Sequence, residues 1–375
     1  MSSSRLPSLL LATLALIGCG APESTEAVPA PPPAAPEVDL VAAGQGREAY
    51  ATYCALCHGA TGEGYLADNA PALANPDFLD SVSDAYLRTA IEEGRPGTPM
   101  SAWAASRGGP LSDADITHLI AFVRSWATEA PIDLSHVTVS GRVELGRTLY
   151  GARCASCHGA SGEGVSAPQL ANPVFLRTAS VGYIRYTIEH GRRGTPMPAF
   201  GDMLDSASID DLVAYVRTLV PGVTTPLVPM GGPPPDLDHL VMNESGPDPG
   251  FELREDRFVP GRAVRDAMDR NARMVLLDAR APSDWARTHI RGAAPFPFYD
   301  VDTLAEHLPN DGTWIIAYCA CPHAASGHVV DELRRRGFSH TAILDEGIPW
   351  WIEQGFPVEA GPLPAGAETI HAAGH

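Results

Sequence analysis

Two short runs of the sequence combine residue types that can hold a metal cofactor. The runs are Cys54-Ala55-Leu56-Cys57-His58 and Cys154-Ala155-Ser156-Cys157-His158. Two thiols three positions apart on a helical turn can form thioethers with the two vinyl groups of one haem, and the adjacent imidazole then faces the iron. The sequence therefore predicts two covalently bound haem c groups, with His58 and His158 as the proximal ligands.

A methionine follows each motif and provides a candidate distal ligand. Met100 and Met197 each end a Gly-Thr-Pro-Met segment, 42 and 39 residues after the motif histidine. A thioether opposite a histidine raises the reduction potential of haem iron and favours electron transfer. Methionine is also a common core residue, and His118 and His190 are rival ligands. Neither rival, however, has a histidine at the equivalent position of the other copy.

The two motifs belong to an internal repeat that covers most of residues 44–220. The matching runs are Gly62-Glu63-Gly64 with Gly162-Glu163-Gly164, and Leu73-Ala74-Asn75-Pro76 with Leu170-Ala171-Asn172-Pro173. A zinc site would need two further ligands in each copy, and a thioredoxin-type dithiol would need a βαβ pattern. The repeat supplies neither of these, so we expect two small helical domains, over residues 44–130 and 140–221.

This region resembles the class I c-type cytochromes, in particular domains related to the third subunit of bacterial cbb3-type oxidases. The resemblance implies an all-α fold whose N- and C-terminal helices cross beside the haem, with Tyr50 and Tyr150 on the N-terminal helices. Arg95 and Arg192 occupy matching positions. They are either partners of the haem propionates or solvated loop charges.

The charge of the chain restricts its partners. The net charge of −19 argues against nucleic acid, because a basic surface is needed to displace phosphate counterions. Residues 44–128 hold five arginines and ten acidic residues, a net −5, whereas residues 141–220 hold eight and seven, a net +1. This asymmetry either steers different redox partners to the two haems or reflects drift on solvated faces. Periplasmic redox proteins or a terminal oxidase are the expected partners.

The N-terminus predicts export. The apolar run from Leu9 to Ile17 is too short to span a bilayer and is typical of a signal peptide, here residues 1–18. The run ends at Cys19, which resembles the lipidation site of a bacterial lipoprotein, and residues 19–43 form a Pro/Ala-rich tether. The alternative is an ordinary signal peptide with an incidental cysteine. We expect a lipid anchor on the periplasmic side of a membrane, with the residues after the cysteine favouring the outer membrane.

The C-terminal third has a different pattern. Residues 222–250 are rich in Pro and Gly and predict a linker. Buried parallel strands are expected at residues 274–278, 314–318 and 341–344, with helices at 328–336 and 350–354. This alternation predicts an α/β domain with a parallel sheet over residues 251–363, followed by a tail at 364–375.

This domain resembles the rhodanese family. The matching runs are Leu277-Asp278-Ala279-Arg280, His289-Ile290-Arg291-Gly292-Ala293, Tyr318-Cys319, Leu344-Asp345-Glu346-Gly347-Ile348 and Gly355-Phe356-Pro357-Val358. The resemblance implies that Cys319 is a nucleophile that carries a persulfide. Asp278 and Arg280 are further candidate site residues.

The loop after Cys319 departs from the family pattern. It reads Cys319-Ala320-Cys321-Pro322-His323-Ala324-Ala325-Ser326 and lacks the arginine that attracts thiosulfate, which speaks against thiosulfate as the substrate. Cys321 is a candidate resolving thiol. Three functions remain open: a dihaem electron carrier, an enzyme in which Cys319 takes up sulfane sulfur and the haems accept electrons, and a carrier whose rhodanese-like domain is an inactive docking module.

Overall fold

The structure is a computed structural model that describes residues 39–67, 69–219, 231–320 and 323–362. All of these residues belong to one compact unit, Ala34–His375. The expected signal peptide, Cys19, most of the tether, Cys321 and the tail lie outside the described residues.

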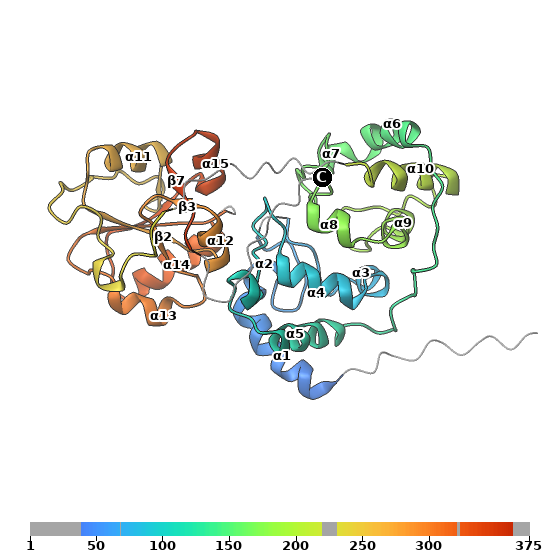
Figure 1. The fold of residues 1–375 in the computed structure, drawn as a ribbon, viewed down its shortest axis with the longest axis horizontal. Coiled ribbons are helices and arrows are strands. Elements are labelled where there is room, and N and C mark those ends of the chain that lie inside the picture. The colour runs from blue at the N-terminus through green and yellow to red at the C-terminus, as the bar shows by residue number, and fades with distance from the viewer. Residues whose placement is uncertain (1–38, 68, 220–230, 321–322, 363–375) are drawn as a thin grey trace, which may run out of the picture. The chain divides into compact units, whose positions relative to one another are not determined.

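The first helical domain contains five α-helices and one 3-10 turn among its described residues. They are α1 (Leu40–Tyr53), α2 (Ala55–His58), α3 (Pro76–Ser81), α4 (Asp84–Glu93), η1 (Ala105–Arg107) and α5 (Asp113–Arg124) (Figure 1). The second domain repeats the α-helices as α6 (Val143–Arg153), α7 (Ala155–His158), α8 (Pro173–Thr178), α9 (Val181–His190) and α10 (Ser206–Val216).

Matching cap residues start the equivalent helices in the two copies. Asn75 and Asn172 cap α3 and α8, and each is followed by a proline at the first helical position. The Ser83 and Ser180 hydroxyls accept the amide hydrogens of the third residues of α4 and α9. Because each cap satisfies an amide that has no partner within its helix, the boundaries of these helices are encoded locally.

The N- and C-terminal helices of each domain cross at a glycine. A Cβ atom built on Gly46 of α1 would lie 2.0 Å from the carbonyl oxygen of His118 in α5. The equivalent atom on Gly146 of α6 would lie 1.9 Å from the carbonyl oxygen of Asp211 in α10. Only glycine permits this approach, so the crossing expected for both copies depends on these two positions.

Replacing Gly46 with alanine is expected to destabilise the first domain by about 1–3 kcal/mol, because the new methyl group overlaps helix backbone that cannot rotate away. Gly44→Ala is the matched control in the same helix: no atom lies within 4 Å of its Cβ. That control is expected to stabilise the helix by about 0.5–1 kcal/mol. Urea unfolding followed by circular dichroism measures both changes, and equal effects would contradict the close crossing.

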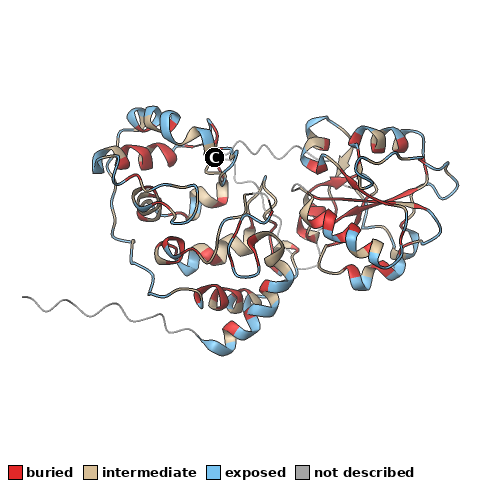
Figure 2. Cartoon of the chain, turned by 180° about the vertical axis from the view of Figure 1, so that it is seen from behind, coloured by how far each residue is buried: buried red, intermediate tan, exposed pale blue. Residues whose placement is uncertain are grey.

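The C-terminal domain is built on a five-stranded parallel sheet with the order β1-β6-β5-β2-β4. Its strands are β1 (Phe258–Val259), β2 (Met274–Asp278), β4 (Ala294–Pro295), β5 (Trp314–Tyr318) and β6 (Thr341–Leu344), while β3 (His289–Ile290) and β7 (Val358–Glu359) form a separate antiparallel pair. The three predicted strands are confirmed with their bounds, and the central ones are coloured as buried in Figure 2.

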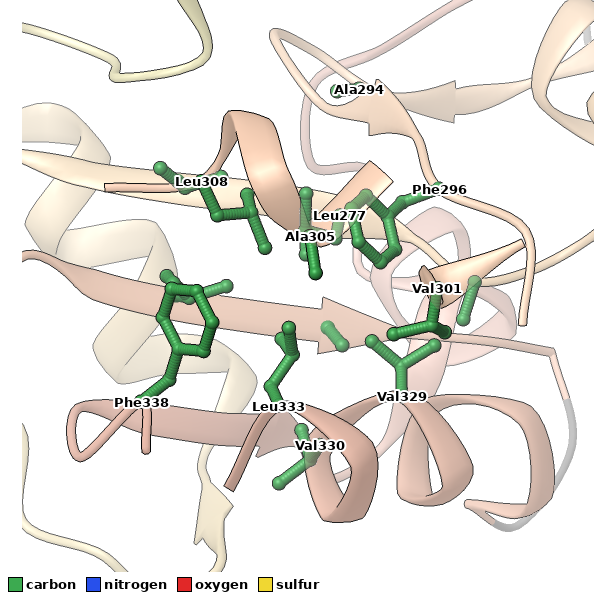
Figure 3. Close-up of a cluster of buried hydrophobic side chains, with 14 of the residues drawn as sticks. Leu277, Ala294, Phe296, Val301, Ala305, Leu308, Val329, Val330, Leu333 and Phe338 are labelled. Carbon is green, nitrogen blue, oxygen red and sulfur yellow. The ribbon is translucent and has the colours of Figure 1, made fainter. Parts of the chain in front are cut away.

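Helices cover both faces of this sheet (Figure 1). They are α11 (Gly261–Asp269) and α15 (Gly347–Glu353) on one side, and α13 (Val301–Leu304) and α14 (Ala324–Arg335) on the other; α12 (Pro282–Arg287) and η3 (Ala305–His307) complete the domain. Val329 and Leu333 point from α14 toward the sheet, where they share a buried cluster with Leu277 of β2 (Figure 3). The helices α14 and α15 begin four and three residues earlier than the sequence predicts.

Part of the segment predicted as a linker is packed against the sheet. Leu240, next to the 3-10 turn η2 (Leu237–His239), is buried in the same cluster as Leu277. The Met242 amide donates to the Met274 carbonyl at 2.8 Å, which places residue 242 beside β2. Residues 231–250 were predicted as a linker from their Pro and Gly content, but two apolar side chains in this stretch pack against the α/β domain.

Candidate haem and sulfur sites

The two Cys-x-x-Cys-His motifs adopt the same local geometry. In each, the first cysteine precedes a single helical turn, α2 or α7, which ends at the histidine. The Nδ1 atom of His58 lies 2.9 Å from the Pro71 carbonyl, and Nδ1 of His158 lies 2.9 Å from the Pro168 carbonyl. With Nδ1–H donating to the carbonyl, the lone pair on Nε2 is available to a metal, as is usual for histidine ligands.

A tyrosine on the preceding helix supports each motif. The hydroxyl of Tyr50 donates to the Gly59 carbonyl at 2.8 Å, and that of Tyr150 donates to the Gly159 carbonyl at 2.9 Å. Both rings are almost fully buried. The sequence placed these tyrosines on the N-terminal helices, but their role in closing the turn after the histidine was missed. The equal spacing of tyrosine and glycine in the two copies was the available signal.

The two methionine segments are also held alike. In the first copy, the Thr98 hydroxyl donates to the Arg95 carbonyl at 2.8 Å and accepts the Met100 amide at 3.2 Å, and the Arg95 amide donates to the Met100 carbonyl at 2.8 Å. The corresponding distances around Met197 are 2.8, 3.2 and 3.0 Å. Both methionine side chains are half-buried against the core of their own domain. The threonine fixes the loop that presents each sulfur.

The residues of each copy fit a covalently attached haem. Each domain supplies two half-buried thiols, one oriented imidazole and one thioether in a helical fold. Burial, with the neighbouring Cys57, raises the pKa of the Cys54 thiol to about 12. Burial and Cys157 likewise raise the pKa of the Cys154 thiol to about 11. Burial also lowers the pKa of His58 and His158, which favours the neutral imidazole that binds iron.

Arg95 and Arg192 lie over aromatic rings. The Arg95 guanidinium is 5.2 Å from the centre of the Tyr86 ring, and that of Arg192 is 5.5 Å from the centre of the Tyr183 ring. Arg192 also donates to the Thr187 hydroxyl at 2.6 Å. Both arginines thus lie over equivalent tyrosines, whereas the Thr187 bond has no counterpart in the first copy, where residue 90 is an alanine. Pairing with haem propionates stays a prediction.

Equivalent residues of the two helical domains contact one another. The Asn75 amide group donates to the Arg193 carbonyl at 2.8 Å, and the Asn172 amide group donates to the Pro96 carbonyl at 3.0 Å. The two acceptors occupy matching positions before the methionines, so the contact is reciprocal. The Asp77 carboxylate adds a bond to the Arg193 guanidinium at 2.8 Å.

Cys319 lies at the carboxyl end of the middle strand of the sheet. It directly follows β5, is 2% exposed, and its sulfur lies 3.2 Å from the Ser326 hydroxyl in the first turn of α14. His323, just before that helix, has a left-handed backbone and places Nε2 at 2.5 Å from the Asp345 carbonyl. The thiol thus lies between the carboxyl end of a parallel strand and the first turn of the following helix.

Asp278 and Arg280 come together with each other at the end of β2. Two Arg280 nitrogens donate to the Asp278 carboxylate at 2.9 and 2.6 Å, and the Tyr318 hydroxyl donates to the same carboxylate at 3.0 Å. Arg280 also donates to the Thr288 carbonyl at 2.6 Å. Asp278 is fully buried. Its bonds to Arg280 and to Tyr318, the residue before Cys319, hold the ends of β2 and β5 together.

These features define the class of the protein. Two helical domains that each combine Cys-x-x-Cys-His with a presented methionine are cytochrome c domains, for which haem c is the cofactor. The third domain is an α/β domain with a parallel sheet and a cysteine directly after its middle strand.

Comparison with known proteins gives the particular families. The family described as cytochrome C oxidase, cbb3-type, subunit III matches residues 41–123 and 141–216, and the rhodanese-like domain family matches residues 262–354. The chain therefore contains cytochrome c domains of the cbb3 subunit III type and a C-terminal rhodanese-like domain, as the sequence predicted.

Similar proteins include cbb3 oxidase subunits. The cbb3-type cytochrome c oxidase subunit FixP of Azorhizobium caulinodans is 33% identical over 195 residues, covering 49% of this chain and 62% of the relative. Subunit CcoP of an Azospirillum species is 32% identical over 192 residues, covering 46% and 61%. The chain thus spans about three fifths of the length of these relatives.

A rhodanese-like domain from an Anabaena protein, solved by solution NMR, is 27% identical. The match covers 32% of this chain and 94% of that chain, with a TM-score of 0.27.

Within the described part of the chain, no helix has the length and apolar character needed to cross a membrane.

Proposed function

We propose that this protein is an exported dihaem c-type cytochrome that passes single electrons between periplasmic redox partners, a terminal oxidase among them. The observation that carries the proposal is the duplicated geometry. Each copy has a histidine whose Nδ1 is bound to a proline carbonyl, and a methionine held in a threonine-fixed loop. Likeness to cbb3 oxidase subunits supports an oxidase as a partner.

The bound haem supplies a one-electron couple, and the chain prepares its surroundings. Cys54 and Cys57, like Cys154 and Cys157, hold the cofactor covalently. The Pro71 and Pro168 carbonyls orient the two imidazoles, and the apolar core of each domain packs against its first motif cysteine and its methionine.

The haem count is tested by the mass of the protein matured in its native secretory route. The unaltered chain is expected to carry two haems, the pair of changes Cys54→Ser and Cys57→Ser is expected to leave one, and Cys154→Ser with Cys157→Ser is the matched pair in the other copy. An unmodified mass for the unaltered protein would overturn the proposal.

We also propose a lipid anchor at Cys19, the first residue of a mature chain that begins with the tether at 19–43. The proposed domain ranges are 44–130 and 140–221 for the helical domains and 251–363 for the rhodanese-like domain. In the structure α1 already begins at Leu40, and Leu240 packs in the rhodanese-like core. Cys19→Ser is expected to move the protein from the membrane fraction to the soluble fraction, whereas Cys319→Ser serves as a control that leaves it there. Unchanged membrane retention of the first variant would contradict the anchor.

A second function is favoured by the position of Cys319. Its buried sulfur lies beside the Ser326 hydroxyl at the start of α14, an arrangement suited to carrying sulfane sulfur as a persulfide, with Cys321 as the resolving thiol. Reduced sulfur compounds are then expected to reduce the haems in the unaltered protein and to fail in Cys319→Ala. Equal haem reduction in both proteins would leave the rhodanese-like domain as a docking module.

A further inference from the structure

The rhodanese-like domain contacts the segment that follows Met100. The Ser101 hydroxyl donates to the Asp284 carboxylate at 2.5 Å, and the Ser283 hydroxyl donates to the Ala102 carbonyl at 2.7 Å. All four of these residues are buried. Two reciprocal hydrogen bonds therefore join the start of α12 to the two residues directly after the proposed distal ligand.

A second contact lies at the first haem-attachment motif. Leu56, between the two cysteines of that motif, packs against the buried cluster that contains Cys319. The ring of Tyr53, at the end of α1, lies 4.8 Å from the ring of Tyr299, centre to centre, with the planes near perpendicular. Burial raises the pKa of Tyr299, which agrees with a ring enclosed between the two domains.

The second cytochrome domain lacks the side chains that make these contacts. The residue equivalent to Leu56 is Ser156 and that equivalent to Tyr53 is Arg153; both are exposed. The residue equivalent to Ser101 is Pro198, which has no hydroxyl group to donate. Tyr53, Leu56 and Ser101 of the first copy are thus replaced in the second copy by an arginine, a serine and a proline.

We propose that the rhodanese-like domain docks specifically on the first cytochrome domain. In this arrangement Ser101 and Asp284 are positioning residues for the Met100 segment, and docking makes the reduction potential of the first haem differ from that of the second. The proposal rests on the haem attachment proposed above. It assigns to the fused domain an effect on one haem that is separate from any sulfur chemistry at Cys319.

The experiment uses the full chain with its haems and reads two properties. Ser101→Ala is expected to shift the midpoint potential of the first haem only, with Ser101→Thr restoring it because the hydroxyl is retained. The paired change Tyr53→Arg and Leu56→Ser converts the docking surface to the residues of the second copy. It is expected to shift the same potential and to speed hydrogen exchange of the peptide over residues 282–287 several-fold.

Two controls match these variants. Ser106→Ala alters an exposed serine in the same domain, and Arg153→Tyr with Ser156→Leu makes the reverse exchange in the second copy. Neither is expected to change the first potential or the exchange. An unchanged first potential in Ser101→Ala, or equal shifts of both potentials, would overturn the proposal. Absence of haem from the unaltered protein would appear in its mass and would count against the proposed function. The exchange measurement does not depend on haem and would still test the docking contact.

Discussion

Replacing Met100 with alanine is expected to remove the proposed distal ligand of the first haem and to lower the reduction potential of that haem strongly. Axial ligands set haem potentials over a range of about 0.8 V, and the thioether lies toward the upper part of that range. The thioether–iron absorption band is expected to lose about half its intensity, because the Met197 site is held by its own threonine and remains intact.

Redox titration followed by optical absorption measures both effects and assigns each haem to its domain. Met197→Ala is the reciprocal variant and is expected to lower the other potential. Met203→Ala is the control, because this methionine is 52% exposed and has no equivalent in the first copy. A Met100→Ala protein that keeps its absorption band and both potentials would show that a different residue is the distal ligand.

Replacing Asp278 with alanine is expected to destabilise the rhodanese-like domain by about 3–5 kcal/mol, because it leaves the Arg280 guanidinium buried without its counter-charge. The Tyr318 hydroxyl also loses its acceptor. Such a loss is a large part of the 5–15 kcal/mol typical of a folded domain. Unfolding of this domain in denaturant, followed by hydrogen exchange of the β5 amides, measures the change.

A surface ion pair provides the control for the stability effect of Asp278→Ala. Arg265 and Asp269 form an ion pair within α11, and Arg265→Ala is expected to cost only about 0.3–0.5 kcal/mol. If Asp278→Ala instead kept full stability and lost only sulfur transfer, Asp278 would act in catalysis and its structural role would be wrong.

The helical domains and their haem motifs could be predicted because the signals are local. Each cysteine pair lies within four residues, Asn75 and Ser83 cap the helices they precede, and the repeat shows every signal twice. The strands at 274–278, 314–318 and 341–344 were predictable for a related reason, since continuous apolar runs of that length are typical of buried parallel strands.

The remaining features depend on contacts between residues far apart in the chain. Ser101 and Asp284 are 183 residues apart, and nothing near either one in the sequence identifies the other. Gly46 looks like an unfavourable helix residue until α5 is placed against it. Leu240 and Met242 lie in a stretch rich in Pro and Gly whose composition hides their burial against the sheet.

The reciprocal bonds of Asn75 and Asn172 have a consequence for assembly. A contact in which the same patch serves both partners is isologous, and it is satisfied once two units have met. A head-to-tail contact would have left one patch open at each end and allowed a growing filament. The tandem copies therefore resemble a homodimer whose subunits are joined in one chain, and this patch is not available to recruit a third unit.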